Sequence, residues 1–128
     1  LIRMDFEQGV DDLDPILMLE KFTQAIDGAG AVILSDYGKG VLNNIQQYIQ
    51  VANQKNIPVL IDPKHQNFSI YAGATLITPN LKEFELAAGK VSSDADLVNK
   101  AKALMEKNNI KAILVTRSEK GMSLVQQD

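Results

Sequence analysis

Short apolar runs alternate along this chain with longer segments in which apolar residues recur every three or four positions. The runs at 31–34, 57–61, 74–77 and 112–115 have the length of buried strands, and Pro58 is the only interruption of the second run. Strands of a parallel sheet are buried on both faces, so their sequences are continuously apolar rather than alternating. The helical segments between the runs supply the crossovers that parallel strands need. The pattern therefore predicts an α/β fold with a mostly parallel sheet covered on both faces.

The boundaries of the other elements follow from local signals. Asp14 and Pro15 are typical of an N-cap and a first helical position, and the helical stripe that follows reaches Ile26. Ser93 is in position to cap a second, longer helix. Further strands are expected at 1–4 and 122–125, further helices at 41–52 and 81–88, and an irregular segment or short helical turn at 67–72.

Composition excludes several classes of function. The chain has 128 residues and a formal net charge of −3, which disfavours broad binding to nucleic acid or anionic membranes. It has no cysteine, a single histidine at His65, and no apolar run long enough to span a membrane. We therefore expect a cytoplasmic protein without a thiol- or histidine-based metal site. The start at Leu1 rather than Met, and the end at Asp128 just after an apolar run, lead us to expect a piece of something longer.

Polar and charged residues follow four successive predicted strands. In a parallel sheet, ligands bind beyond the carboxyl ends of the strands. Carboxylates there suit Mg²⁺, and lysines suit phosphoryl oxygens. The strand-end candidates are Asp36 and Lys39, Asp62 and Lys64, Asn80 and Glu83, and Thr116 with Ser118, Glu119 and Gly121.

Each of these segments also has a purely structural interpretation. Asn80 followed by Glu83 is the signature of a helix capping box. Residues 35–40 and 62–63 match ordinary turns, and residues 116–121 match a hairpin turn between two strands. The glycines at 38 and 40 do not form a Walker loop, because no Ser or Thr follows Lys39. Since all four segments fall on one edge of the sheet, we favour an anion or nucleotide site for the set.

The same segments occur in the same order in the ribokinase-like (PfkB) carbohydrate kinases, which the chain resembles through nearly all of its length. Its Ser-Asp-Tyr-x-Lys-Gly and Thr-Arg-Ser-Glu-x-Gly-Met elements are similar to those of the heptose-7-phosphate kinase subgroup. The resemblance implies a three-layer ribokinase-like (Rossmann-like) fold, present here as a partial domain. The segments that carry it are LSDYGKG (34–40), IDPK (61–64), LITPNLKEFE (76–85) and VTRSEKGM (115–122).

By position, the resemblance also implies roles. Asn80 and Glu83 match the Asn-x-x-Glu element of the family, which organises Mg²⁺ and the phosphates through water. Asp36 belongs near the same cluster, and Lys39 and Lys64 are phosphate contacts that are less securely placed.

The turn after the last parallel strand is implied to hold the ATP phosphates, largely through its backbone. Thr116, Ser118 and Gly121 match this turn. Arg117 and Glu119 are expected to flank the nucleotide, whereas His65 is expected to face solvent from a loop and to bind no ligand.

The implied reaction is transfer of the γ-phosphoryl group of ATP to the anomeric hydroxyl of heptose 7-phosphate, in ADP-heptose and lipopolysaccharide core synthesis. The Gly-Ala-Gly-Asp segment that carries the catalytic base of the family does not occur in this chain. We expect it beyond Asp128, and the glycine pair and lid strands that close over the sugar before Leu1. Residues 1–128 are thus expected to be the central portion of one kinase domain, with no catalytic residue and no turnover alone. The parent is expected to be a homodimer, and proteins of this subgroup are often fused to an adenylyltransferase.

Two alternatives stay open at this point. One is a kinase of the same family for another sugar or a nucleoside. The other is a non-catalytic α/β binding module, such as a phosphoacceptor domain with an Asp at a strand end. Mg²⁺-dependent nucleotide binding separates a kinase from such a module.

Overall fold

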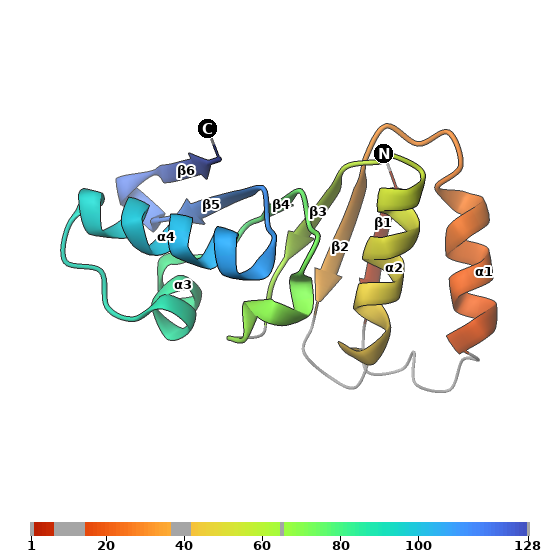
Figure 1. Cartoon of the computed structure of the whole chain (residues 1–128), viewed down its shortest axis with the longest axis horizontal. Helices are drawn as coiled ribbons and strands as arrows, with labels where there is room; N and C mark the ends of the chain where they lie inside the picture. The colour runs from red at the N-terminus through yellow and green to blue at the C-terminus, as the bar shows by residue number, and fades with distance from the viewer. Residues whose placement is uncertain (1, 7–14, 37–41, 65, 128) are drawn as a thin grey trace.

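The structure is a computed structural model, and it describes residues 2–6, 15–36, 42–64 and 66–127 (Figure 1). Its strands form one sheet of six, and their order in space is their order in the sequence. The strands are β1 (Ile2–Phe6), β2 (Val32–Asp36), β3 (Val59–Asp62), β4 (Leu76–Ile77), β5 (Ala112–Thr116) and β6 (Met122–Gln126).

The sheet is mostly parallel, as the continuous apolar runs predict. The strands β1 to β5 pair in parallel, whereas β6 returns antiparallel to β5. The connection between β5 and β6 is a short hairpin, so no helix is needed there. The first five strands therefore direct their carboxyl ends to the same edge.

Helices connect the parallel strands. They are α1 (Pro15–Ala25), α2 (Leu42–Gln54), α3 (Leu81–Ala88) and α4 (Asp94–Asn108), and a 3₁₀ turn at Phe68–Tyr71 confirms the expected short helical turn. Ser93 caps α4 as predicted, because its Oγ accepts a hydrogen bond of 3.0 Å from the backbone N–H of Asp96. The N-cap predicted at Asp14 lies outside the described residues.

The hydrophobic core lies between the sheet and its helices. From β2, Val32 and Leu34 are fully buried, and α1 and α2 meet through Phe22 and Tyr48. These two rings pack edge to face with their centroids 4.6 Å apart, an arrangement that aromatic quadrupoles favour. The same burial raises the pKa of the Tyr48 hydroxyl. Packing of this kind fixes the helices on the sheet and so fixes the strand ends.

Among the described residues, helices cover only one face of the sheet. In Figure 1, α2 and α4 lie in front of the strands and α1 lies beside α2, consistent with right-handed crossovers between strands in sequential order. Leu60, Leu76 and Leu114 point to the opposite face and are only half-buried. Beside them, Met122 and Leu124 of β6 are 68% and 55% exposed. The second helical layer of a three-layer fold is therefore not supplied by the described residues.

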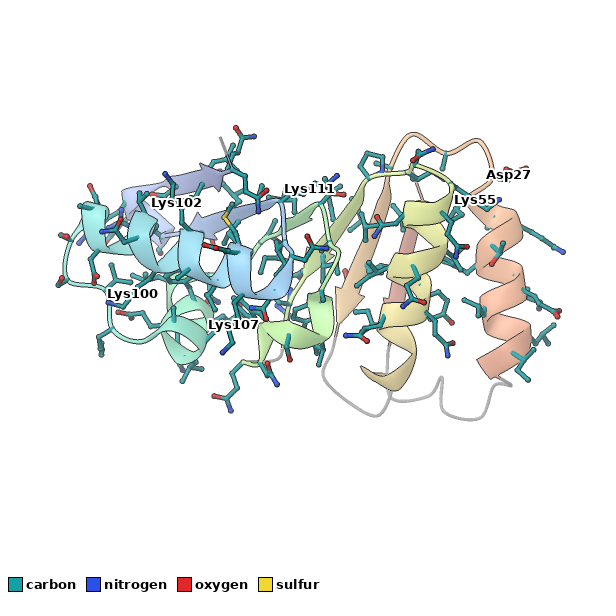
Figure 2. The ribbon with its side chains drawn as sticks, viewed as in Figure 1. Asp27, Lys55, Lys100, Lys102, Lys107 and Lys111 are labelled. Carbon is teal, nitrogen blue, oxygen red and sulfur yellow. The ribbon has the colours of Figure 1, made fainter. Side chains whose placement is uncertain are left out.

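The edge of the sheet away from the carboxyl ends carries surface ion pairs. Asp27, just after α1, lies 3.4 Å from Lys55, just after α2, and Figure 2 shows both side chains at that edge.

Among the described helices, none is both long and apolar enough to cross a bilayer.

Candidate functional site

The ends of β2, β3, β4 and β5 surround one cavity of about 480 Å³. Backbone pairing assembles it: Ser35 lies opposite Asp62, and Asn80 forms a parallel bridge with Thr116. The N–H of Thr116 also donates to the carbonyl of Pro79 at 3.0 Å, so the segments after β4 and β5 are joined directly. The cavity is lined by Ile33, Ser35, Asp62, Lys64, Thr78, Asn80, Glu83 and Thr116.

Asn80 and Glu83 form the capping box at the start of α3. The Oδ1 of Asn80 accepts from the N–H of Glu83 at 2.7 Å, and the Oε1 of Glu83 accepts from the N–H of Asn80 at 2.8 Å. The structural interpretation is thus confirmed. Both side chains also line the cavity, so capping and ligand binding are compatible roles of the same residues.

The second carboxylate oxygen of Glu83 faces a lysine. Its Oε2 lies 3.7 Å from the Nζ of Lys64, and the same Nζ lies 3.5 Å from the Oδ1 of Asp62. Lys64 therefore places one positive charge between two negative ones. Of the predicted strand-end residues, five come together in the cavity: Asp62, Lys64, Asn80, Glu83 and Thr116.

Ser35, Thr78 and Ile33 line the cavity although they are not among the predicted site residues. Their strand positions explain this, because side chains two apart on a strand share a face. Ser35 pairs with Asp62 in the register of β2 and β3, so both point to the same side. Strand parity could have found Thr78, which lies two residues before Asn80, whereas Ser35 and Ile33 follow only from the register between β2 and β3.

Residues 116–121 form the hairpin turn between β5 and β6, which confirms the structural interpretation of that segment. The N–H of Arg117 donates to the carbonyl of Gly121 at 2.7 Å, and Ser118 and Gly121 have positive φ values of 54° and 85°. Thr116 lines the cavity. Within the described part of the chain, Ser118, Glu119 and Gly121 are exposed and are not among the lining residues.

Arg117 binds away from the cavity. Its Nη1 donates to Asp94 at the start of α4 at 2.8 Å and contacts the Oγ of Ser123 at 3.5 Å. Alternation along β5 puts it on the helix-covered face, opposite Thr116. Its Nε is buried with no hydrogen-bond partner among the described residues. The side chain expected to flank a nucleotide instead joins the hairpin turn to α4.

Three predicted positions, Asp36, Lys39 and His65, have side chains that the structure does not describe. Asp36 ends β2 beside Ser35, and its backbone pairs with Phe6. Lys39 and His65 lie outside the described residues.

Oxygen donors of the cavity fit a hard cation such as Mg²⁺. Asp62 and Glu83 offer carboxylates, and Asn80 offers an amide, the donor types that Mg²⁺ prefers. Within the described ranges, no cluster of three or more Asp, Glu, His or Cys side chains is placed to hold a metal alone. In proteins, Mg²⁺ is usually held by one or two carboxylates together with water and substrate phosphates.

Comparison with known proteins gives consistent results. The family model for "pfkB family carbohydrate kinase" matches residues 17–128. The chain is 52% identical to the bifunctional protein HldE of Erwinia tasmaniensis and 50% identical to that of Yersinia pestis, each over 126 residues and 98% of this chain. It spans only 26% of the length of either relative.

Solved structures share the fold. Arabidopsis thaliana ribokinase, in a complex with ribose and ATP, matches 84% of this chain and 35% of its own with a TM-score of 0.72 and 18% identity. Escherichia coli phosphofructokinase-2, in a complex with fructose-6-phosphate, matches 86% of this chain and 39% of its own with a TM-score of 0.67 and 18% identity. At these identities the likeness is one of fold. The family model covers most of the sequence, and the chain therefore belongs to the pfkB family of carbohydrate kinases.

Proposed function

We propose that the chain is the central, nucleotide-binding portion of an ATP-dependent sugar-phosphate kinase domain. The observation that carries this proposal is the cavity at the carboxyl ends of the strands. It gathers two carboxylates, an amide and a lysine from two segments of the chain, at the ends of β3 and β4. This mixture matches the needs of phosphoryl transfer, where phosphates and their counter-ions must be positioned together.

Within this site, each residue has a role that its chemistry allows. Glu83, Asp62 and Asn80 hold Mg²⁺, mostly through water, as does Asp36 at the end of β2. Bound Mg²⁺ supplies positive charge against the phosphoryl oxygens. Lys64 contacts a phosphate, and so does Lys39 in the segment after β2.

The hairpin turn after β5 contributes to nucleotide binding in this proposal. Thr116 contacts the phosphates from within the cavity. Ser118, Glu119 and Gly121 would lie along the path toward the adenine.

We propose heptose 7-phosphate as the acceptor, phosphorylated on its anomeric hydroxyl to the 1,7-bisphosphate. Support comes from the subgroup elements at 35–40 and 116–122 and from the 50–52% identity to proteins named HldE. The pathway would then be ADP-heptose and lipopolysaccharide core synthesis, in the cytoplasm. A kinase of the family for another sugar or nucleoside is the competing assignment.

We also propose that these residues act within a longer polypeptide. The relatives are about four times as long as the matched segment, and they are described as bifunctional. The longer chain would supply the catalytic Asp, the sugar-closing strands and helices for the uncovered sheet face. A second adenylyltransferase domain and a homodimer belong to the same proposal, and residues 1–128 alone are expected to be inactive.

The test is ADP release by the intact protein with Mg-ATP. Heptose 7-phosphate, fructose 6-phosphate, fructose 1-phosphate and ribose are offered in parallel, and the isolated segment 1–128 is assayed as a control. Selective turnover with heptose 7-phosphate is the expected result. Turnover with another sugar alone would discard the heptose assignment, and absence of both turnover and ATP binding would discard the kinase.

A further inference from the structure

The ammonium group of Lys64 occupies the space between the two carboxylates of the cavity. It lies 3.5 Å from Asp62 and 3.7 Å from Glu83. The Oε1 of Glu83 is already engaged by the capping box, so Lys64 faces the oxygen that remains for a ligand. A cation bound to these carboxylates would meet the positive charge of Lys64 at close range.

We infer that Lys64 is an exchangeable counter-ion for this site. Without ligand, it neutralises Asp62 and Glu83, and when the metal and nucleotide bind, it leaves the carboxylates and moves to the phosphoryl oxygens. This inference rests on the proposed function, because it presumes that the carboxylates face a metal and the lysine a phosphate. It adds that Lys64 and the metal compete for the carboxylates of Asp62 and Glu83, which the proposed function does not state.

The local structure permits the exchange. The backbone N–H of Lys64 donates to the hydroxyl of the buried Tyr71 at 3.3 Å, which fixes the base of the side chain. Its tip is freer, since the side chain is 41% exposed and also lines a second hollow of about 210 Å³ with Gln66 and Leu86. The ion pairs are partly exposed, and such pairs are weak enough to be replaced.

The experiment compares the intact protein with Lys64→Met in two separate titrations. Mn²⁺ binding without nucleotide is followed by electron paramagnetic resonance, and ATP binding in excess EDTA by calorimetry. The inference predicts opposite changes, with Mn²⁺ bound about three to ten times more tightly by the variant and ATP at least about three times more weakly. A merely structural role for Lys64 would leave both affinities unchanged or weaken both.

Lys82→Met is the matched control. Lys82 is exposed on the first turn of α3, and it is not among the described residues that line the cavity. The Lys82→Met substitution removes the same charge as Lys64→Met. It is expected to change the affinities for Mn²⁺ and ATP less than about twofold, because exposed charges are screened over short distances. Unchanged Mn²⁺ affinity in Lys64→Met, with ATP binding weakened, would overturn the exchange while leaving the kinase assignment intact. Absence of ATP binding by the unsubstituted protein, with and without Mn²⁺, would instead remove the proposed function.

Discussion

Glu83 shows how a single residue serves both the fold and a site. One carboxylate oxygen closes the capping box of α3, and the other faces Lys64 in the cavity. The two interpretations of the Asn-x-x-Glu element that the sequence leaves open are therefore not exclusive. A substitution that keeps the hydrogen bond but removes the charge separates the contributions.

Glu83→Gln is such a substitution. The amide oxygen of Gln can still accept from the N–H of Asn80, so the free energy of unfolding is expected to fall by less than about 0.5 kcal/mol. In the proposed site, the charge that would hold the cation is lost, and kcat of the intact protein should fall about tenfold to a hundredfold with a higher requirement for Mg²⁺. Urea unfolding and steady-state kinetics measure the two effects. Glu106→Gln, at an exposed position of α4, is the control and should change neither.

Asn80 allows the complementary comparison. Asn80→Ala removes the N-cap and is expected to cost about 1 kcal/mol of unfolding free energy, whereas Asn80→Ser keeps an oxygen that accepts at the same position. Both variants lose the amide in the cavity, so both should lower the rate of the intact protein. Equal rates for Asn80→Ser and the unsubstituted protein would leave Asn80 as a cap alone.

At the scale of elements, the start of α4 is held by a compact set of polar contacts. Asp96 accepts hydrogen bonds from the Nζ of Lys100 at 2.8 and 2.7 Å and from the N–H of Ser92 at 2.9 Å. Arg117 reaches the neighbouring Asp94 from the hairpin turn after β5. The position of that turn therefore depends on how α4 begins.

The Asp96 contacts predict a dependence of stability on pH. The hydrogen bonds from Lys100, and then from Ser92, hold the pKa of the Asp96 carboxyl below its usual value of 3.8. Because the folded-state pKa is lowered, the stabilisation is present above pH 3.8 and is lost as the pH falls through the lower folded-state pKa. Asp96→Asn should therefore lower the urea midpoint at neutral pH, and the gap between variant and parent should narrow in acid. A gap that is constant with pH would contradict this assignment.

The Arg117 contact predicts unequal effects of its two partners. The side chain of Arg117 is 18% exposed and that of Asp94 is 85% exposed. Arg117→Ala should therefore cost about 1–2 kcal/mol through lost packing, and Asp94→Ala about 0.5 kcal/mol, since exposed ion pairs contribute little. Urea unfolding of each variant measures this difference, and equal costs would show that the ion pair dominates.

At the scale of the whole molecule, one face of the sheet carries apolar side chains that no described helix covers. Leu60, Leu76 and Leu114 continue across the sheet into Met122 and Leu124, the exposed residues of β6. Contiguous apolar surface of this kind marks contact with other protein. It is the physical reason to expect helices from a longer polypeptide on this face.

A double substitution, Met122→Glu with Leu124→Glu, tests that expectation. If helices of the intact protein cover the face, the variant should lose several °C in Tm, because two charges would be buried without partners. In the isolated segment 1–128 the same change should instead reduce self-association, measured by analytical ultracentrifugation. Gln47→Glu with Gln50→Glu, at exposed positions of α2, is the control. An intact protein with unchanged Tm would mean that β6 faces solvent.

The sequence predicted the elements well and the contacts poorly, for physical reasons. Buried parallel strands are continuous apolar runs, so β2 to β5 were evident. The antiparallel direction of β6 follows from the hairpin turn at residues 116–121, which is one of the two interpretations that the sequence allows for that segment. Coverage of both faces was expected, but the strand order that puts three helices on one face is a tertiary property. At the site, residue types pointed to the edge of the sheet where the cavity lies, whereas the position of Lys64 and the contact of Arg117 with α4 depend on side-chain packing that no local pattern encodes.

The agreement between strand order and chain order has a consequence for synthesis on the ribosome. Each of the strands β2 to β6 pairs with the strand immediately before it in the sequence, so none must wait for a later segment or insert between two strands already paired. Domains fold as units during translation, beginning from the N-terminal side. A sheet of this order can be extended one strand at a time as the polypeptide emerges. The addition of β6 needs only the turn at Ser118–Lys120. The cavity wall at Thr116 does not depend on β6, because it forms when Thr116 of β5 pairs with Asn80 after β4.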